Sequence, residues 1–350
     1  MLKYKIFNFN LRAKIRKIMD LKPNIVILST GGTITGEAID MLSTKDYVIG
    51  KISIQRLLQS TPSFQSIANI TLEEIANIDS ADMSNAIWLN LAHKTDNLLK
   101  DSNIDGIVIT HGSDTLEESA YFLHLVLKSH KPVVFTAAIR PFSAIGSDAI
   151  KNLYNAISLA GHKESSHKGV MVVMNDKIYS AREVSKTHTL NLEAFNAPNS
   201  GAMGYIIDGE IFFHTMPLKP HTQDTPFNIQ DLDILPKVDI VYSYCNDGSK
   251  VAIEAFVKVG SEGLIIAGSG AGSIHKTPKD YLRGLLKKQA IIVVKSSRVG
   301  AGLVPLTQKE LREGFISANN LNPQKARVLL MLALSKTKAI KTIREYFKKY

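Results

Sequence analysis

The chain has 350 residues and a mass of 38.5 kDa, which exceeds the usual limit for one hydrophobic core, so we expect about two domains. A hydrophobic fraction of 45% excludes a disordered chain, and the single cysteine excludes an intrachain disulfide or a multi-cysteine metal site. The formal net charge is +10, but its excess lies in residues 1–20 and 336–350, which disfavours a nucleic-acid-binding surface on the folded body.

Residues 1–21 form a basic amino-terminal extension before the first strand-like segment. The extension lacks the roughly 7–15-residue apolar stretch and the small-residue cleavage site of a secretory signal peptide. We therefore expect a cytoplasmic location and no membrane association. Met19 offers an alternative start just before the first strand.

Short apolar runs then alternate with helical patterns, as is typical of parallel strands joined by crossover helices. The predicted strands span 24–28, 106–110, 133–137, 169–174, 238–244, 263–267 and 290–295. The predicted helices span 116–128, 150–160, 250–259, 279–288 and 323–334. Thr115 and Glu118 have the spacing of a capping box, and Asn322 before Pro323 predicts the start of the last helix.

Prolines among polar residues interrupt this alternation near 214–233. We therefore expect a linker at 215–234. The linker would join two α/β domains. The first, at 22–214, would have a mostly parallel, flavodoxin- or Rossmann-like sheet with flanking helices. The second, at 235–350, would be smaller and would also have a parallel sheet. Such sheets bind ligands at the carboxyl ends of their strands.

The first predicted strand ends in a Gly-Gly-Thr sequence. Gly31 and Gly32 allow a tight turn and a close approach of a ligand to the backbone. The hydroxyl of Thr33 would then face the crevice, where it could act as a nucleophile. A plain strand-to-loop turn explains the same residues, so this motif alone is weak evidence.

The second predicted strand leads through His111 and Gly112 to Ser113 and Asp114 at the start of a helix. Hydroxyl and backbone N–H donors there suit a substrate carboxylate, and the Asp114 carboxylate suits an ammonium group. Helix capping explains Ser113 and Asp114 equally well. We interpret His111 as a structural histidine.

A threonine nucleophile needs a proton acceptor, because its hydroxyl is hardly ionised at neutral pH. Lys186 and Tyr47 are the candidates. A surface lysine and a packed tyrosine are the alternative interpretations of these two residues.

Four segments carry a resemblance to a known family: 27–36, 106–141, 172–176 and 321–327. They resemble the bacterial type II L-asparaginases and glutaminase-asparaginases, and the likeness covers nearly everything after Asp20. It implies hydrolysis of L-asparagine to L-aspartate and ammonia through an acyl-enzyme, with lower activity on L-glutamine. We expect no metal and no organic cofactor, because the hydroxyl, the base and the oxyanion donors supply this chemistry.

The resemblance also implies the role of each residue. Thr33 would be the nucleophile, with Tyr47 at the hinge of a mobile lid over residues 34–46. Ser113, Asp114 and Lys186 would help to transfer protons and activate water, and the backbone N–H groups of Thr33 and near Ser113 would stabilise the oxyanion. The residues implied to bind substrate are Gly32, Ser80, Ala81, Ser113, Asp114, Ala138 and Ser273.

The resemblance further implies a homotetramer built as a dimer of intimate dimers. The small domain of a neighbouring subunit would supply Ser273 and the carboxylate of Glu310, with Glu313 as the alternative carboxylate. The family also makes a periplasmic location possible.

Three residues depart from common patterns of the family. Ser113 stands where many relatives have threonine, and Ala81 stands where glutamine or glutamate commonly contacts the substrate ammonium. Ser273 resembles the more asparagine-selective relatives. Ala81 and Ser273 together predict a preference for asparagine over glutamine.

Two other functions remain open at this point. A non-catalytic amino-acid-binding relative is suggested by Ala81 and Ser113. A nucleotide-binding module is suggested by the glycine-rich residues 268–272, which lack the complete Gly-x-Gly-x-x-Gly spacing.

Overall fold

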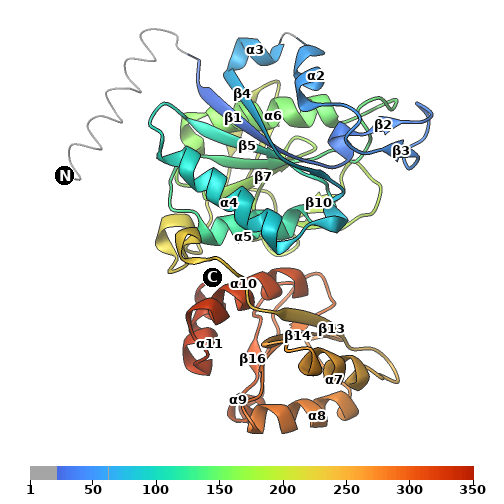
Figure 1. Ribbon diagram of the computed structural model, residues 1–350, viewed down its shortest axis with the longest axis vertical. Helices are drawn as coiled ribbons and strands as arrows, with labels where there is room; N and C mark the ends of the chain where they lie inside the picture. Colours follow the sequence, from blue (N-terminus) through green and yellow to red (C-terminus); the bar gives the residue numbers. More distant parts are fainter. Residues whose placement is uncertain (1–21, 62) are drawn as a thin grey trace, which may run out of the picture.

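The computed structural model describes residues 22–61 and 63–350, so the predicted basic extension lies outside the described residues. The described chain forms two α/β units, one above the other in Figure 1, built on an eight-stranded and a four-stranded sheet. Within these residues no helix combines the length and apolar character needed to cross a bilayer.

The large sheet has the strand order β12-β11-β8-β7-β6-β5-β1-β4. The pairs among β4, β1, β5, β6 and β7 are parallel, and those from β7 to β12 are antiparallel. Its strands are β1 Asn24–Gly31, β4 Asn69–Ile78, β5 Gly106–Thr110, β6 Val133–Thr136, β7 Val170–Met174, β8 Lys177–Ser180, β11 Gly204–Ile207 and β12 Glu210–Phe213.

Both faces of this sheet are buried. Alternate residues of β1 enter different cores: Val26 and Leu28 lie in one, and Ile25 and Ile27 in the other. Helices α4 (Asn85–Lys100) and α5 (Leu116–Val126) cover the first face, and α6 (Ala149–Gly161), α2 (Ile54–Gln59) and α3 (Ser63–Ile67) cover the second. Burial on both sides explains why the central strands are continuous apolar runs.

The small unit has an all-parallel sheet in the order β13-β14-β15-β16. Its strands are β13 Val238–Tyr242, β14 Gly263–Gly268, β15 Ile292–Ser297 and β16 Ile316–Ser317. Its helices are α7 Lys250–Lys258, α8 Lys276–Lys287, α9 Gln308–Glu313, α10 Pro323–Lys336 and α11 Ile340–Lys349. Helix α10 packs on both β14 and α5, so it lies between the two units (Figure 1).

Residues 215–234 connect β12 to β13 and are packed rather than loose. They contain the short 3₁₀ helices η4 (Thr222–Asp224) and η5 (Ile229–Asp231), and the side chain of Phe227 is fully buried. Lys128 holds the segment by donating to the carbonyl oxygens of Thr222 and Thr225, at 3.2 and 2.6 Å.

The predicted capping box at Thr115 is wrong. Thr115 precedes α5, but its side chain makes no capping hydrogen bond, because the backbone N–H of Glu118 donates to the carbonyl oxygen of Thr115 at 3.1 Å. The Thr115 hydroxyl donates to the carbonyl oxygen of Ser80 at 2.7 Å. The predicted cap of α10 is confirmed: the Asn322 side chain accepts from the backbone N–H of Lys325, and Pro323 occupies the first turn.

Candidate active site

Four neighbouring parallel strands, β4, β1, β5 and β6, end at the same edge of the large sheet. The residues that follow them include Ser80, Thr33, Ser113 and Ile139, and all four line one pocket of about 220 Å³. A pocket therefore lies at the strand ends, where the sequence predicts the site. A pocket below the roughly 300–1,000 Å³ typical of drug-sized ligands suits a small molecule.

Glycines allow the first two of these turns to touch. Gly31 and Gly32 have φ angles of 95° and 84°, in the region that favours glycine. A Cβ atom on Gly32 would lie 2.3 Å from the Cα of Gly112, so the turns after β1 and β5 meet backbone to backbone. This contact brings the Thr33 and Ser113 segments to one pocket.

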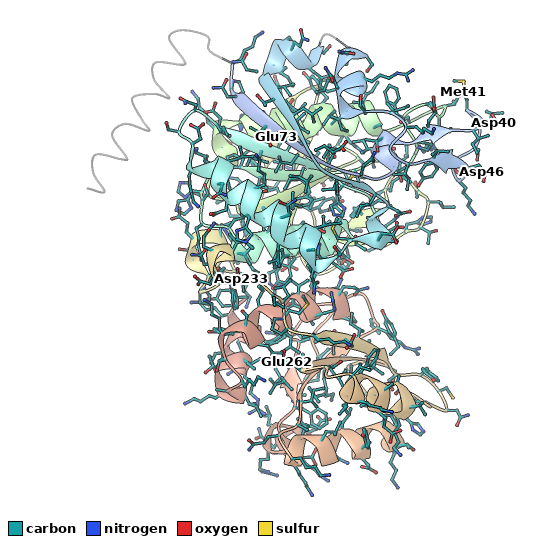
Figure 2. All side chains as sticks on the ribbon, in the orientation of Figure 1. Asp40, Met41, Asp46, Glu73, Asp233 and Glu262 are labelled. Atoms are coloured by element: carbon teal, nitrogen blue, oxygen red, sulfur yellow. The ribbon has the colours of Figure 1, made fainter. Side chains whose placement is uncertain are left out.

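One side of the pocket carries a hydroxyl and a phenol. Thr33 begins the short 3₁₀ helix η1 (Thr33–Thr35), and its Oγ1 lies 2.8 Å from the hydroxyl of Tyr47, in β3 (Tyr47–Val48). Strand β3 pairs with β2 (Glu37–Ala38), so the expected lid residues form a hairpin. Figure 2 shows its connecting loop, with Met41, projecting from the rest of the domain.

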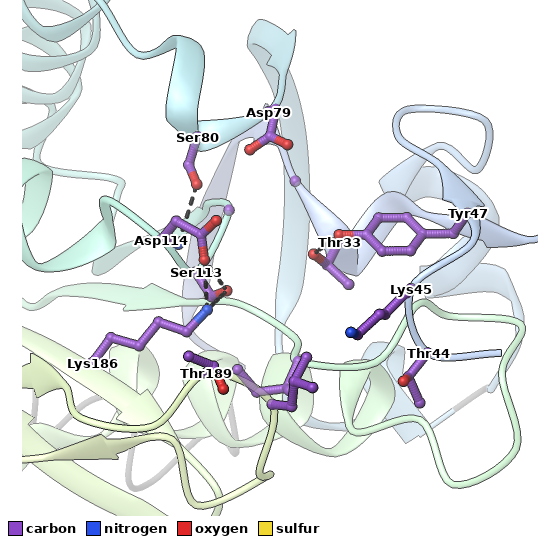
Figure 3. A pocket seen from close by; sticks show the side chains of 14 residues that line it. Thr33, Thr44, Lys45, Tyr47, Asp79, Ser80, Ser113, Asp114, Lys186 and Thr189 are labelled. Atoms are coloured by element: carbon purple, nitrogen blue, oxygen red, sulfur yellow. Dashed lines mark hydrogen bonds and ion pairs between the residues drawn. The ribbon is translucent and has the colours of Figure 1, made fainter.

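The opposite side carries a lysine, a hydroxyl and a carboxylate (Figure 3). Lys186 lies in β9 (Ser185–Lys186), which pairs with β10 (Phe195–Asn196). Its Nζ donates to Ser113 Oγ at 2.8 Å and to Asp114 Oδ1 at 2.5 Å. Of the described residues, none is recorded as a partner of Asp114 Oδ2, and the Asp114 side chain is 60% exposed, so this oxygen can meet a cation.

Ser80, which follows β4, packs against the turn that carries Asp114. Its Oγ accepts from the backbone N–H of Asp114 at 3.2 Å, and it opens the 3₁₀ helix η2 (Ser80–Asp82), which Asp79 caps. A Cβ on Gly112 would lie 2.6 Å from Ser80 Oγ, so glycine is required for this close contact.

Of the predicted site residues, Gly32, Thr33, Tyr47, Ser80, Ser113, Asp114 and Lys186 share this pocket. Ala81, Ala138 and Ser273 do not line it within this chain. Ala138 is buried beside Ile139, which does line it. Ser273 follows β14 in the small unit, where its carbonyl oxygen accepts from the backbone N–H of Ser269 at 2.9 Å.

Glu310 lies on α9 and is engaged within its own chain. Its Oε1 accepts from Lys279 and Lys295, each at 2.8 Å, and its Oε2 completes a capping box with Thr307. Burial would raise the pKa of Glu310, but the hydrogen bonds from Lys279 and Lys295 lower it to about 2. The alternative carboxylate, Glu313, pairs with Arg283 at 3.0 Å. A contribution of either to a neighbouring subunit stays a prediction.

Sequence reasoning missed several lining residues. Thr44 and Lys45 come from the β2–β3 hairpin, and Thr189 and Leu190 follow β9. Figure 3 shows the Lys45 amine directed towards the pocket. These residues lie in loops without apolar periodicity, so no local pattern marks them. No group of three or more His, Cys, Asp or Glu suited to a metal ion occurs in residues 22–61 and 63–350.

The chain is thus a two-domain α/β protein whose small pocket is lined by hydroxyl, phenol, amine and carboxylate groups. Two family models match, "Asparaginase, N-terminal" over residues 24–219 and "Glutaminase/Asparaginase C-terminal domain" over residues 237–347. The chain therefore belongs to the asparaginase family of amidohydrolases.

Similar proteins cover nearly the whole chain. It is 45% identical to L-asparaginase 2 of Bacillus subtilis over 94% of this chain and 87% of that one. It is 40% identical to a glutaminase-asparaginase of Pseudomonas fluorescens, over 93% and 90%. The crystal structure of a probable cytoplasmic L-asparaginase from Campylobacter jejuni matches with a TM-score of 0.92 and 54% identity, over 94% of this chain and all of that one.

Proposed function

We propose that this protein hydrolyses L-asparagine to L-aspartate and ammonia through an acyl-enzyme on Thr33. The observation that carries the proposal is the placement of the Thr33 hydroxyl, beside the Tyr47 phenol, across one small pocket from the Ser113, Asp114 and Lys186 side chains. The names of the similar proteins, L-asparaginase and glutaminase-asparaginase, support the same substrate class.

In the first step, Thr33 Oγ1 attacks the side-chain amide carbon. Tyr47, at 2.8 Å, is placed to accept the hydroxyl proton as its phenol passes its own proton on towards the leaving nitrogen. The carbon–nitrogen bond breaks, the nitrogen leaves as ammonia after taking up a proton, and an aspartyl ester forms on Thr33. Water then attacks this ester, aspartate leaves, and the Thr33 hydroxyl is restored.

The charged head of the substrate would be held on the other side of the pocket. Asp114 Oδ2 would accept from the substrate ammonium, and Ser80 would bind its carboxylate. Lys186, held by Ser113 and Asp114, would transfer protons and orient the attacking water. The backbone N–H groups of Thr33 and Ser113 would stabilise the oxyanion.

Ammonia release from asparagine by the purified protein tests the proposal. We expect Thr33→Ala and Lys186→Ala each to lower kcat by about 10⁴-fold, as loss of a member of such a unit does. Thr189→Ala is the matched control, because it removes another hydroxyl from the same pocket and should keep most of the activity. If the wild-type protein binds aspartate but releases no ammonia, the non-catalytic amino-acid-binding alternative is favoured. If it binds a nucleotide, the nucleotide-binding alternative is favoured.

The preference between amides is a separate prediction. We expect kcat/KM to be about 10- to 200-fold higher for asparagine than for glutamine, the usual effect of one methylene. Ser273→Asn should narrow this ratio if the neighbouring small domain contributes to the pocket, whereas Ser269→Asn in the same loop should not. Near-equal values for the wild-type protein would reject the preference.

We further propose a cytoplasmic homotetramer. The edge hairpin β11–β12 exposes Ile207 and Phe212, with exposed fractions of 59% and 44%. Exposed apolar side chains on a sheet edge favour contact with another copy of the chain. The cytoplasmic assignment is supported by the name of a similar protein, the probable cytoplasmic L-asparaginase of Campylobacter jejuni.

A further inference from the structure

A chain of buried hydrogen bonds runs from Trp88 to Gly112, which lines the pocket. The indole Nε1 of Trp88, on α4, donates to Ser119 Oγ, on α5, at 2.7 Å. Ser119 Oγ lies 2.9 Å from His111 Nε2, and His111 Nδ1 lies 2.7 Å from the carbonyl oxygen of Gly112. The exposed fractions of Trp88, Ser119 and His111 are 4%, 0% and 0%.

The chemistry of these groups sets the direction of every hydrogen bond. The Gly112 carbonyl oxygen can only accept, so Nδ1 of His111 carries a proton. Burial lowers the pKa of His111 to about 4, so the ring is neutral at pH 7 and its Nε2 is an acceptor. Ser119 therefore donates its proton to Nε2 and accepts from Trp88.

The last hydrogen bond acts on a peptide group at the pocket. The carbonyl of Gly112 and the N–H of Ser113 belong to one planar peptide unit, and both residues line the pocket. A donor on the carbonyl oxygen polarises the whole unit and makes its N–H a better donor. No acceptor for the Ser113 N–H is recorded among residues 22–61 and 63–350, so this donor can serve a ligand.

The same bond also fixes the orientation of the peptide. If the Gly112–Ser113 unit turned over, the buried Nδ1–H of His111 would lose its acceptor, which is costly away from water. The His111 backbone is anchored as well, because its N–H donates to the carbonyl oxygen of Thr136 at 3.0 Å. His111 itself is fully buried and does not line the pocket.

We propose that His111, oriented by Ser119 and Trp88, is a positioning residue that aims and polarises the Gly112–Ser113 peptide so that the Ser113 N–H stabilises the oxyanion. The inference rests on the proposed amide hydrolysis and assigns to His111 an effect on the transition state. Loss of this residue should therefore lower kcat, whereas KM, which reflects binding of the head group, should change little.

The experiment compares two substitutions at His111 in the full-length protein. His111→Leu removes the donor to Gly112 and should lower kcat for asparagine about 10- to 100-fold. This decrease is at most comparable to the decrease in kcat that follows loss of a whole oxyanion donor. KM should stay within about threefold of the wild-type value. His111→Asn places an amide N–H near the position of Nδ1 and should recover most of kcat. Phe122→Leu, next to Trp88 in the same core, is the packing control and should leave kcat unchanged.

Three results for the His111 variants would overturn the inference. A kcat for His111→Leu within twofold of the wild type, a loss confined to KM, or failure of His111→Asn to recover activity would overturn it while leaving asparagine hydrolysis intact. If His111→Leu does not fold, Ser119→Ala takes its place, and an unchanged kcat would overturn the inference. A wild-type protein without amide hydrolysis would overturn both this inference and the proposed function.

Discussion

Burial of histidines links the stability of this protein to pH. The folded state holds His111 neutral, with its pKa lowered to about 4 by burial, and burial together with the neighbouring His221 also lowers the pKa of His124. An unfolded histidine titrates near pH 6.5. Between about pH 6.5 and pH 4 the unfolded chain therefore binds protons that the folded chain does not, so stability falls as the pH falls.

For His111 alone the loss should reach about 3 kcal/mol by pH 4. Urea unfolding at pH 7 and at about pH 4 measures this loss, with His111→Asn as the comparison because asparagine does not titrate. The free energy of unfolding should decrease more on acidification in the wild type than in the variant. Equal decreases would show that His111 is not held neutral by the fold.

At the residue scale, the sequence located the side chains that follow apolar strands. Thr33, Ser113 and Asp114 line one pocket, and they were predicted because a strand, a glycine turn and a polar residue lie next to one another in the chain. Lys186 was suggested by chemistry and by family resemblance, since its contact with Ser113 spans 73 positions. Thr115 was misassigned because the backbone N–H of Glu118 donates to the Thr115 carbonyl oxygen and not to its side chain. The Thr115 hydroxyl meets the Ser80 carbonyl oxygen, which is distant in sequence.

At the element scale, helix α9 depends on a buried ion cluster. Glu310 and Lys295 have side-chain exposed fractions of 6% and 5%, so removing the carboxylate leaves a buried ammonium without its partner. We expect Glu310→Ala to lower the free energy of unfolding by about 3–5 kcal/mol. Glu313→Ala breaks the more exposed pair with Arg283 and should cost about 0–1 kcal/mol.

Urea unfolding of both variants gives these free energies. The kcat of the folded Glu310→Ala variant distinguishes a structural role of Glu310 from a catalytic contribution to a neighbouring subunit. A structural role leaves kcat unchanged at a temperature where the variant is folded. A large loss of kcat without loss of stability would instead support the predicted contribution to a neighbouring subunit.

The sequence predicted buried strands better than exposed ones. Strands β5 and β14 are continuous apolar runs and were located to within a residue at each end. Strand β4 was missed, because it lies at the sheet edge, contains Glu73 and Glu74, and has no continuously buried run. Helix α8 starts earlier than expected, at Lys276, because the His275 side chain caps it.

At the scale of the whole molecule, the proposed tetramer can be tested directly. Light scattering on the eluting peak of a sizing column should give four times the 38.5 kDa chain mass. Substituting Phe212 and Ile207 on the β11–β12 hairpin with lysine should shift the assembly to smaller species, because charge on an exposed sheet edge opposes pairing. A wild-type protein with the mass of one chain would contradict the assembly.

The central claim is a covalent aspartyl ester on Thr33, and trapping it is the most direct test. The protein is mixed with saturating asparagine, quenched in acid during turnover, digested and examined by mass spectrometry. We predict that the peptide containing Thr33 gains the mass of one aspartyl group, and that Thr33→Ala shows no such gain. An aspartyl group on a different residue, or a Thr33→Ala variant that releases ammonia at the wild-type rate, would contradict the claim.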